Sequence, residues 1–182
     1  MKAIIQYQTE NLTILRMAEV ASPTPSPTQL LVDVKATALN RADILQRKGA
    51  YPPPPGESSI LGLELAGVVR QIGHKVEGFS VGDRVFGLVS GGAYAEKTVI
   101  DHRLAMHIPE NWSFEDAAAV TEVFFTASET LFSRGQLEEG ETVLIHAGGS
   151  GVGSAAVQLA NQAGATVLAT AGTTEKARRV PE

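Results

Sequence analysis

The sequence contains no cysteine among its 182 residues, which excludes disulfide bonds and zinc sites built from thiolates. It also lacks an excess of basic residues. Its formal net charge of −5 argues against nucleic acids and anionic membranes as partners. No stretch approaches the roughly 20 apolar residues of a membrane span, and the N-terminus lacks the apolar core of a signal peptide. These absences predict a soluble protein of the cytoplasm.

Residues 1–120 have the composition of a β-rich domain. Proline-rich segments at Ser22–Pro27 and Gly49–Gly56 predict loops, because proline removes a backbone donor and restricts its neighbour. The remaining segments, rich in strand-forming residues and separated by turn residues, predict a compact barrel-like or sandwich domain. The predicted strands are Met1–Gln8, Leu12–Val20, Gln29–Ala38, Leu61–Ile72, Gly82–Leu88 and Ala93–Ile100.

A short helix is predicted within this domain at Asn40–Arg47. Asn40 is a suitable N-terminal cap, and the helical spacing places Ala42, Ile44 and Leu45 on one side.

The pattern changes after Pro109. Ser113–Asp116 is typical of a helix start, and a further helix is predicted over Val123–Arg134, ending at Gly135. We expect these helices to form the crossing between two domains, residues 1–120 and 121–182.

The second domain contains a glycine-rich turn between a strand and a helix. The strand Val143–Ile145 leads into this turn, and Ala155–Ala160 follows as a helix. A Rossmann pattern places glycines where backbone N–H groups approach a diphosphate at the N-terminus of a helix. In this chain serine occupies the middle glycine position, so the alternative of a tight turn without a ligand stays open. The predicted cofactor contacts are Gly148, Ser150, Gly151, Val152 and Gly153.

The end of the next predicted strand, Ala165–Ala171, indicates which dinucleotide fits. Enzymes that prefer NAD place an acidic residue about 20 positions after the glycines to hold the ribose 2′-hydroxyl. Here Gly172 and Thr173 follow the strand, and Lys176 lies just beyond, so the segment favours NADPH. Glu175 is a counterargument, and Arg178 and Arg179 are interpreted as ordinary surface residues of the following helix.

Several segments, in order along the chain, resemble the zinc-free quinone oxidoreductases of the medium-chain dehydrogenase/reductase superfamily, especially the p53-inducible branch. The resemblance implies a GroES-like domain followed by a Rossmann domain, with NADPH as hydride donor and a quinone as acceptor. The matching segments are Ala38–Asp43, Gln46–Pro54, Ile60–Glu64, Val81–Val85 and Ile145–Gly153.

The resemblance also implies residue roles. It places Asn40 and Tyr51 by the nicotinamide as catalytic hydrogen-bond donors and Thr126 at the cofactor, whereas Glu64 is interpreted as a structural acceptor. Zinc-dependent relatives carry a cysteine near position 40 and a histidine at position 63. This chain has leucine at position 63 and no cysteine, so no metal is predicted. A quinone is already electrophilic, and its reduction needs positioning and hydrogen bonding rather than a Lewis acid.

The chain ends roughly one strand–helix–strand unit after the glycine turn. We therefore expect an α/β (overall α+β) fold with a GroES-like, barrel-type domain and an incomplete Rossmann domain, truncated near Pro181, where proline would break the next helix. Family members form homodimers, and the dimer edge is expected to be missing. Activity is expected to be weak or absent. The alternatives are a non-catalytic regulatory form and an enoyl-thioester reductase.

Overall fold

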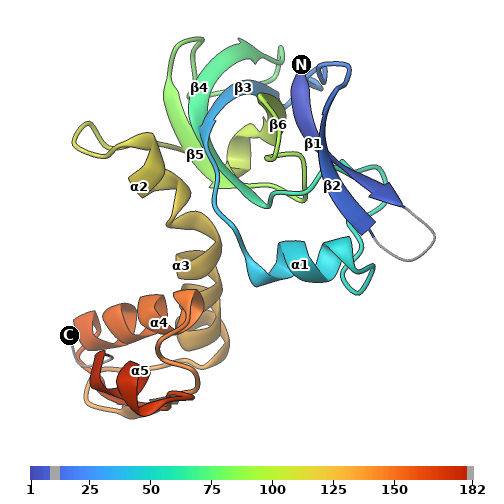
Figure 1. Ribbon diagram of the computed structural model, residues 1–182. Helices are drawn as coiled ribbons and strands as arrows, with labels where there is room; N and C mark the ends of the chain where they lie inside the picture. The colour runs from blue at the N-terminus through green and yellow to red at the C-terminus, as the bar shows by residue number, and fades with distance from the viewer. Residues whose placement is uncertain (9–12, 180–182) are drawn as a thin grey trace. The chain divides into compact units, whose positions relative to one another are not determined.

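The computed structural model describes residues 1–8 and 13–179, which divide into two compact units after Thr121 (Figure 1). The first unit is built mainly from antiparallel strands, and the second combines a short parallel sheet with helices. The predicted fold class, a GroES-like domain with part of a Rossmann-like domain, is confirmed. The predicted strand start at Leu12 and the predicted break at Pro181 lie outside the described residues.

A five-stranded antiparallel sheet forms the body of the first unit, and a separate ribbon of two strands lies at the N-terminus (Figure 1). The sheet has the order β6-β3-β4-β5-β7, and the ribbon pairs β1 with β2. The ribbon is joined to the rest of the unit by a bridge between Ala3 and Ala95. The strands are β1 (Lys2–Gln8), β2 (Thr13–Glu19), β3 (Gln29–Ala36), β4 (Glu64–Ile72), β5 (Arg84–Leu88), β6 (Lys97–Asp101) and β7 (Ala105–His107).

The core of this unit consists of aliphatic side chains from the sheet, which burial removes from water. Its fully buried members are Leu30, Val32, Leu65, Val69, Val85 and Ile100. The start of β3 does not show the alternation of buried and exposed residues that is usual in a strand. Leu30, Leu31 and Val32 are all buried, because the pairing with β4 shifts register between Leu31 and Val32.

Helix α1 (Arg41–Arg47) begins after its cap residue Asn40, as predicted, but its buried side differs from the prediction. The residues that α1 buries are Asp43 and Gln46, whereas Ile44 is 52% exposed. The predicted apolar side was wrong because hydrogen bonds from distant parts of the unit compensate the burial of a carboxylate.

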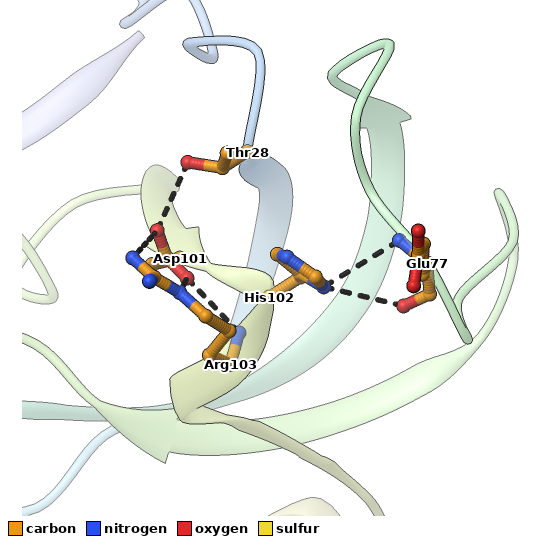
Figure 2. Close-up of polar contacts among 5 residues, drawn as sticks. All are labelled: Thr28, Glu77, Asp101, His102 and Arg103. Carbon is orange, nitrogen blue, oxygen red and sulfur yellow. Dashed lines mark hydrogen bonds and ion pairs between the residues drawn. The ribbon is translucent and has the colours of Figure 1, made fainter.

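Two further helical segments complete the first unit, η1 (His102–Leu104) and α2 (Phe114–Ala118). The predicted cap at Ser113 is confirmed, since its hydroxyl accepts a hydrogen bond from the Asp116 N–H at 3.0 Å. Asp101 joins η1 to the start of β3 (Figure 2). Its carboxylate accepts hydrogen bonds from Thr28 Oγ1 at 2.9 Å and from Arg103 Nε at 2.8 Å.

The second unit contains the parallel pair β8 (Thr142–Ile145) and β9 (Thr166–Ala169), connected by α4 (Gly151–Gln162). Helix α3 (Thr121–Ser128) runs into a π-helical turn, η2 (Glu129–Arg134), and the short α5 (Thr174–Arg179) follows β9. The predicted helix end at Gly135 is confirmed, although the left-handed conformation falls on Gln136, with φ of 50°. Alanine side chains of α4 pack with Ile145 in a common core.

Candidate functional site

The side chain of Asn40 is held by a buried carboxylate. Its Nδ2 donates a hydrogen bond to Oε1 of Glu64 at 2.7 Å. Glu64 opens β4 and is only 1% exposed, whereas Asn40 is half-buried at the start of α1. The structure therefore brings these two predicted family residues into direct contact, and Asn40 is more than a helix cap.

Asp43 anchors the same region from within α1. Its Oδ2 accepts hydrogen bonds from the backbone N–H of Asn40 at 2.7 Å and from the hydroxyl of Tyr94 at 2.9 Å. Its Oδ1 accepts the N–H of Gly62 at 3.2 Å. We call Asn40, Asp43, Glu64 and Tyr94, together with Gly62, the carboxylate network.

Sequence reasoning missed Asp43 and Tyr94. The spacing of Asn40 and Asp43 was an available signal, because an acidic residue three positions after a helix cap reaches back to the cap's N–H. Nothing in the local sequence around Tyr94 indicates its role. Burial, together with the hydrogen bond to the negatively charged Asp43, raises the pKa of Tyr94 well above its usual value.

Gly62 cannot be replaced without moving its neighbours. It has a φ of +100°, and a Cβ at this position would lie 2.6 Å from the backbone N and from Cδ1 of Tyr94. Glycine therefore allows the loop before β4 to approach Tyr94 while donating to Asp43.

Tyr51, the second predicted catalytic residue, follows α1 in the proline-rich loop. Its side chain is 53% exposed. Asn40 and Tyr51 thus lie in the same unit on opposite ends of α1, but the carboxylate network does not include Tyr51.

The positions that carry zinc ligands in metal-dependent relatives hold Asn40 and Leu63, and Leu63 is buried. Within residues 1–8 and 13–179, no three side chains of His, Asp or Glu are grouped so that they can hold a metal ion. The prediction of a metal-free site continues to rest on the residue types at these two positions.

The glycine-rich loop of the second unit leads directly into α4. Ser150 is the N-cap of this helix, and its Oγ accepts the N–H of Gly153 at 3.1 Å. This explains why serine occupies the middle glycine position, since serine is among the preferred N-cap residues. A Cβ on Gly153 would collide with the carbonyl oxygen of Ala147, so the helix and the turn approach closely only with glycine there. Ala147 itself adopts a left-handed conformation, with φ of 55°.

Thr170, which follows β9, ties the glycine-rich loop to the sheet. Its carbonyl oxygen accepts the N–H of Gly148 at 2.9 Å, and its hydroxyl oxygen accepts the N–H of Ala147 at 3.2 Å. Sequence reasoning missed this residue. Because β8 and β9 are parallel, with Ile145 opposite Ala169, both strands deliver their following residues to the same edge.

The remaining predicted cofactor residues also lie in the second unit. A Cβ on Gly151 would lie 3.0 Å from Cγ1 of Val123, so α3 contacts the start of α4. Thr126 lies three residues after Val123 on α3 and is exposed. This spacing keeps Thr126 on the same side of α3 as Val123.

Beyond β9, the hydroxyl of Thr173 caps α5. It accepts the N–H of Lys176 at 3.2 Å. Gly172 and Lys176 are exposed, and no acidic residue occupies Ala171 to Thr173. The edge that receives the glycine-rich loop therefore carries backbone donors, hydroxyls and a cation.

Residues 26–110 match the alcohol dehydrogenase GroES-like domain. Over 144 residues the chain is 48% identical to erythronolide synthase EryA2 of Saccharopolyspora erythraea, an alignment that covers 79% of the chain and 4% of that protein.

Two solved structures are similar over almost the whole chain. Escherichia coli quinone oxidoreductase complexed with NADPH has a TM-score of 0.86 at 32% identity, covering 99% of this chain and 55% of that one. CurK enoyl reductase has a TM-score of 0.84 at 28% identity, covering 99% and 56%. The chain thus spans little more than half the length of these structures. No helix within the described residues has the length and apolar character required to span a membrane.

Proposed function

Because this chain belongs to the medium-chain dehydrogenase/reductase superfamily of oxidoreductases and carries its GroES-like domain, we propose that it serves metal-free hydride transfer from NADPH to a quinone. The observation that carries the proposal is the glycine-rich loop, which leads into the N-terminus of α4 and is tied to the end of β9 by Thr170. The cofactor supplies the hydride. The residues of this chain bind it, orient the acceptor and offer hydrogen bonds.

The loop fits a dinucleotide diphosphate for physical reasons. The first N–H groups of a helix have no intrahelical acceptor and carry partial positive charge, so they favour an anion. Gly153 lets the turn approach the helix, and the hydroxyl hydrogen of Ser150 remains a donor while its oxygen caps α4. Gly148, Gly151 and Val152 complete the proposed diphosphate site.

Selectivity for NADPH is proposed from Gly172, Thr173 and Lys176. An acidic side chain after β9 would repel a 2′-phosphate, and this chain has none from Ala171 to Thr173. Lys176 lies within the first turn of α5 and supplies a cation. Thr126 on α3 is proposed as a further cofactor contact.

For the acceptor we propose Asn40 and Tyr51 as hydrogen-bond donors. As hydride reaches a quinone, negative charge develops on its carbonyl oxygen, and donors aimed at that oxygen lower the barrier. The amide of Asn40 has a second N–H beyond the one bonded to Glu64. The phenol of Tyr51 is exposed on a proline-rich loop.

The direct test is titration of the purified protein with NADPH and with NADH, followed by turnover of a simple benzoquinone. We expect NADPH to bind more tightly than NADH and to raise the melting temperature. Equal affinity for both nucleotides, or none for either, would contradict the proposed cofactor. We also propose that turnover by the chain itself is low.

An enoyl-thioester reductase is the second candidate, favoured by the similarity to CurK enoyl reductase. Both reactions deliver hydride to an acceptor in which charge develops on a carbonyl oxygen, so the same donors serve either one. Comparing kcat/KM for a quinone with that for an enoyl thioester decides between them.

A non-catalytic regulatory form is the third candidate. It predicts a protein that associates with itself and shows no thermal shift with NADPH. The resemblance implies that family members are homodimers, and sedimentation measures whether this chain associates. A cytoplasmic location is proposed from the composition of the sequence, and cell fractionation tests it.

A further inference from the structure

We propose that Glu64 is a positioning residue that fixes the orientation of the Asn40 amide, so that an N–H of Asn40, and not its oxygen, faces the acceptor. The catalytic part of this proposal rests on the proposed function. The orientation itself is a property of the carboxylate network and can be measured separately.

The geometry of the pair supports one orientation of the amide. Nδ2 of Asn40 lies 2.7 Å from Oε1 of Glu64. Oε1 accepts this hydrogen bond, and an oxygen that accepts selects the NH₂ end of the amide. Rotating the amide by 180° would place Oδ1 against the carboxylate, where two acceptors repel each other.

Burial strengthens this selection. Glu64 is 1% exposed, and a buried carboxylate is stable only when donors surround it. Water does not compete for this hydrogen bond as it would on the surface. The hydrogen bond between Asn40 and Glu64 is therefore stronger than one between two exposed polar side chains.

Both partners also have fixed backbones. The N–H of Asn40 donates to Asp43 Oδ2, and the carbonyl oxygen of Glu64 accepts from Thr37 Oγ1 at 2.7 Å. These bonds do not involve the Glu64 carboxylate, so Glu64→Gln leaves them in place. This separation makes an isosteric variant informative.

The direction of the second side-chain N–H of Asn40 determines whether the amide can stabilise the transition state. With one N–H bonded to Glu64, the amide keeps a second donor for the oxygen on which charge develops. A rotated amide would present a lone pair to that oxygen and would raise the barrier. Glu64 thus acts through Asn40 and does not itself contact the acceptor.

The test is Glu64→Gln, compared with the wild-type protein and with Glu57→Gln, which makes the same chemical change on an exposed glutamate. The first readout is the side-chain N–H₂ signals of Asn40 in a ¹⁵N-edited NMR spectrum, assigned by their loss in Asn40→Ala. We expect a widely separated pair of proton signals in the wild type and in Glu57→Gln. In Glu64→Gln the separation should shrink or the signals should double, because glutamine allows both amide orientations.

The second readout is kinetic. Glu64→Gln should lower kcat about tenfold and leave KM for NADPH within about twofold, the pattern of an interaction lost mainly in the transition state. Unchanged Asn40 signals in a folded Glu64→Gln protein would overturn the proposal, whatever the rates. Changed signals in a protein whose wild type binds neither NADPH nor NADH would support the orientation and contradict the proposed function instead.

If Glu64→Gln does not fold, a measurement on the wild-type protein still tests the proposal. A side-chain N–H of Asn40 bonded to a buried carboxylate has a proton shift that changes little with temperature. A temperature dependence equal to that of solvent-exposed amides would overturn the proposal. A small dependence on one of the two protons only would support it.

Discussion

The hydroxyl of Tyr94 donates a hydrogen bond to the carboxylate of Asp43 at a distance of 2.9 Å, although 51 residues separate the two in sequence. The contact joins the loop before β6 to α1, the helix that begins beside Asn40. Its removal is the simplest way to test how far the carboxylate network stabilises the first unit.

We predict that Tyr94→Phe lowers the free energy of unfolding by about 1–2 kcal/mol, the cost of a hydrogen bond to a charged group when the other donors to it remain. Asp43 keeps the N–H groups of Asn40 and Gly62 as donors. Denaturant unfolding measures the change. Tyr7→Phe is the matched control, because Tyr7 is 50% exposed. An equal loss in both variants would show that the Tyr94 hydroxyl contributes nothing specific.

The same residue predicts behaviour at alkaline pH. Burial raises the pKa of Tyr94, and Asp43 raises it further, so the folded protein holds this proton more tightly than the unfolded chain. The stabilisation is complete below the unfolded tyrosine pKa, near 10, and is lost as the pH rises above it. Absorbance titration should show a late tyrosine ionisation step, and Tyr94→Phe should remove that step.

Acid should weaken the connection made by Asp101. The hydrogen bond from Arg103 lowers the pKa of Asp101 well below its usual value, and the hydroxyl of Thr28 adds to this effect (Figure 2). A lowered folded pKa means that the stabilisation is present above the unfolded pKa, near 4, and is lost as the pH falls below it. Because the Arg103 side chain is 74% exposed, Asp101→Asn should lower the melting temperature at pH 7 by only a few degrees. The difference from the wild type should shrink towards pH 2, and a constant difference would contradict this account.

The sequence predicted those parts of the fold that local patterns determine. The strand, turn and helix around Gly153 were predicted because the apolar run, the glycine-rich turn and the alanine-rich segment follow one another directly in the sequence. The short β7 was missed, since three residues carry no recognisable period.

The predictions from sequence failed where contacts between residues that are distant in the sequence determine the local structure. Ala93–Ile100 was predicted as a strand, but β6 begins only at Lys97, because Ala93 and Tyr94 donate backbone hydrogen bonds to Gly62 and Leu61. The buried side of α1 was predicted wrongly for the same reason. Asp43 can lie in the interior because Gly62 and Tyr94 donate hydrogen bonds to its carboxylate. Among the site residues, Asn40 and Glu64 were both named from the resemblance, but their contact could not be predicted.

We predict that the protein associates with itself through the exposed side of β8 and β9. Leu144 and Leu168 lie opposite each other in the register and are 56% and 54% exposed. Exposed apolar residues that lie side by side on a sheet favour contact with other chains. We expect sedimentation to show concentration-dependent association that the double variant Leu144→Thr/Leu168→Thr reduces, because threonine keeps the strand propensity and removes apolar surface. A monomeric wild type at all concentrations would contradict this prediction.

Ser150 allows stability and cofactor binding to be separated, because it caps α4 and also lies in the proposed diphosphate site. Ser150→Ala should cost about 1 kcal/mol of stability through the lost cap and should weaken NADPH binding. Ser150→Asp keeps a good cap, so its stability should equal that of the wild type, whereas its carboxylate would repel the diphosphate and should reduce NADPH affinity at least tenfold. Ser113→Ala, which removes the cap of α2, is the control and should lose stability without losing affinity. If Ser150→Asp binds NADPH as the wild type does, the start of α4 is not where the diphosphate lies, and the proposed cofactor site is wrong.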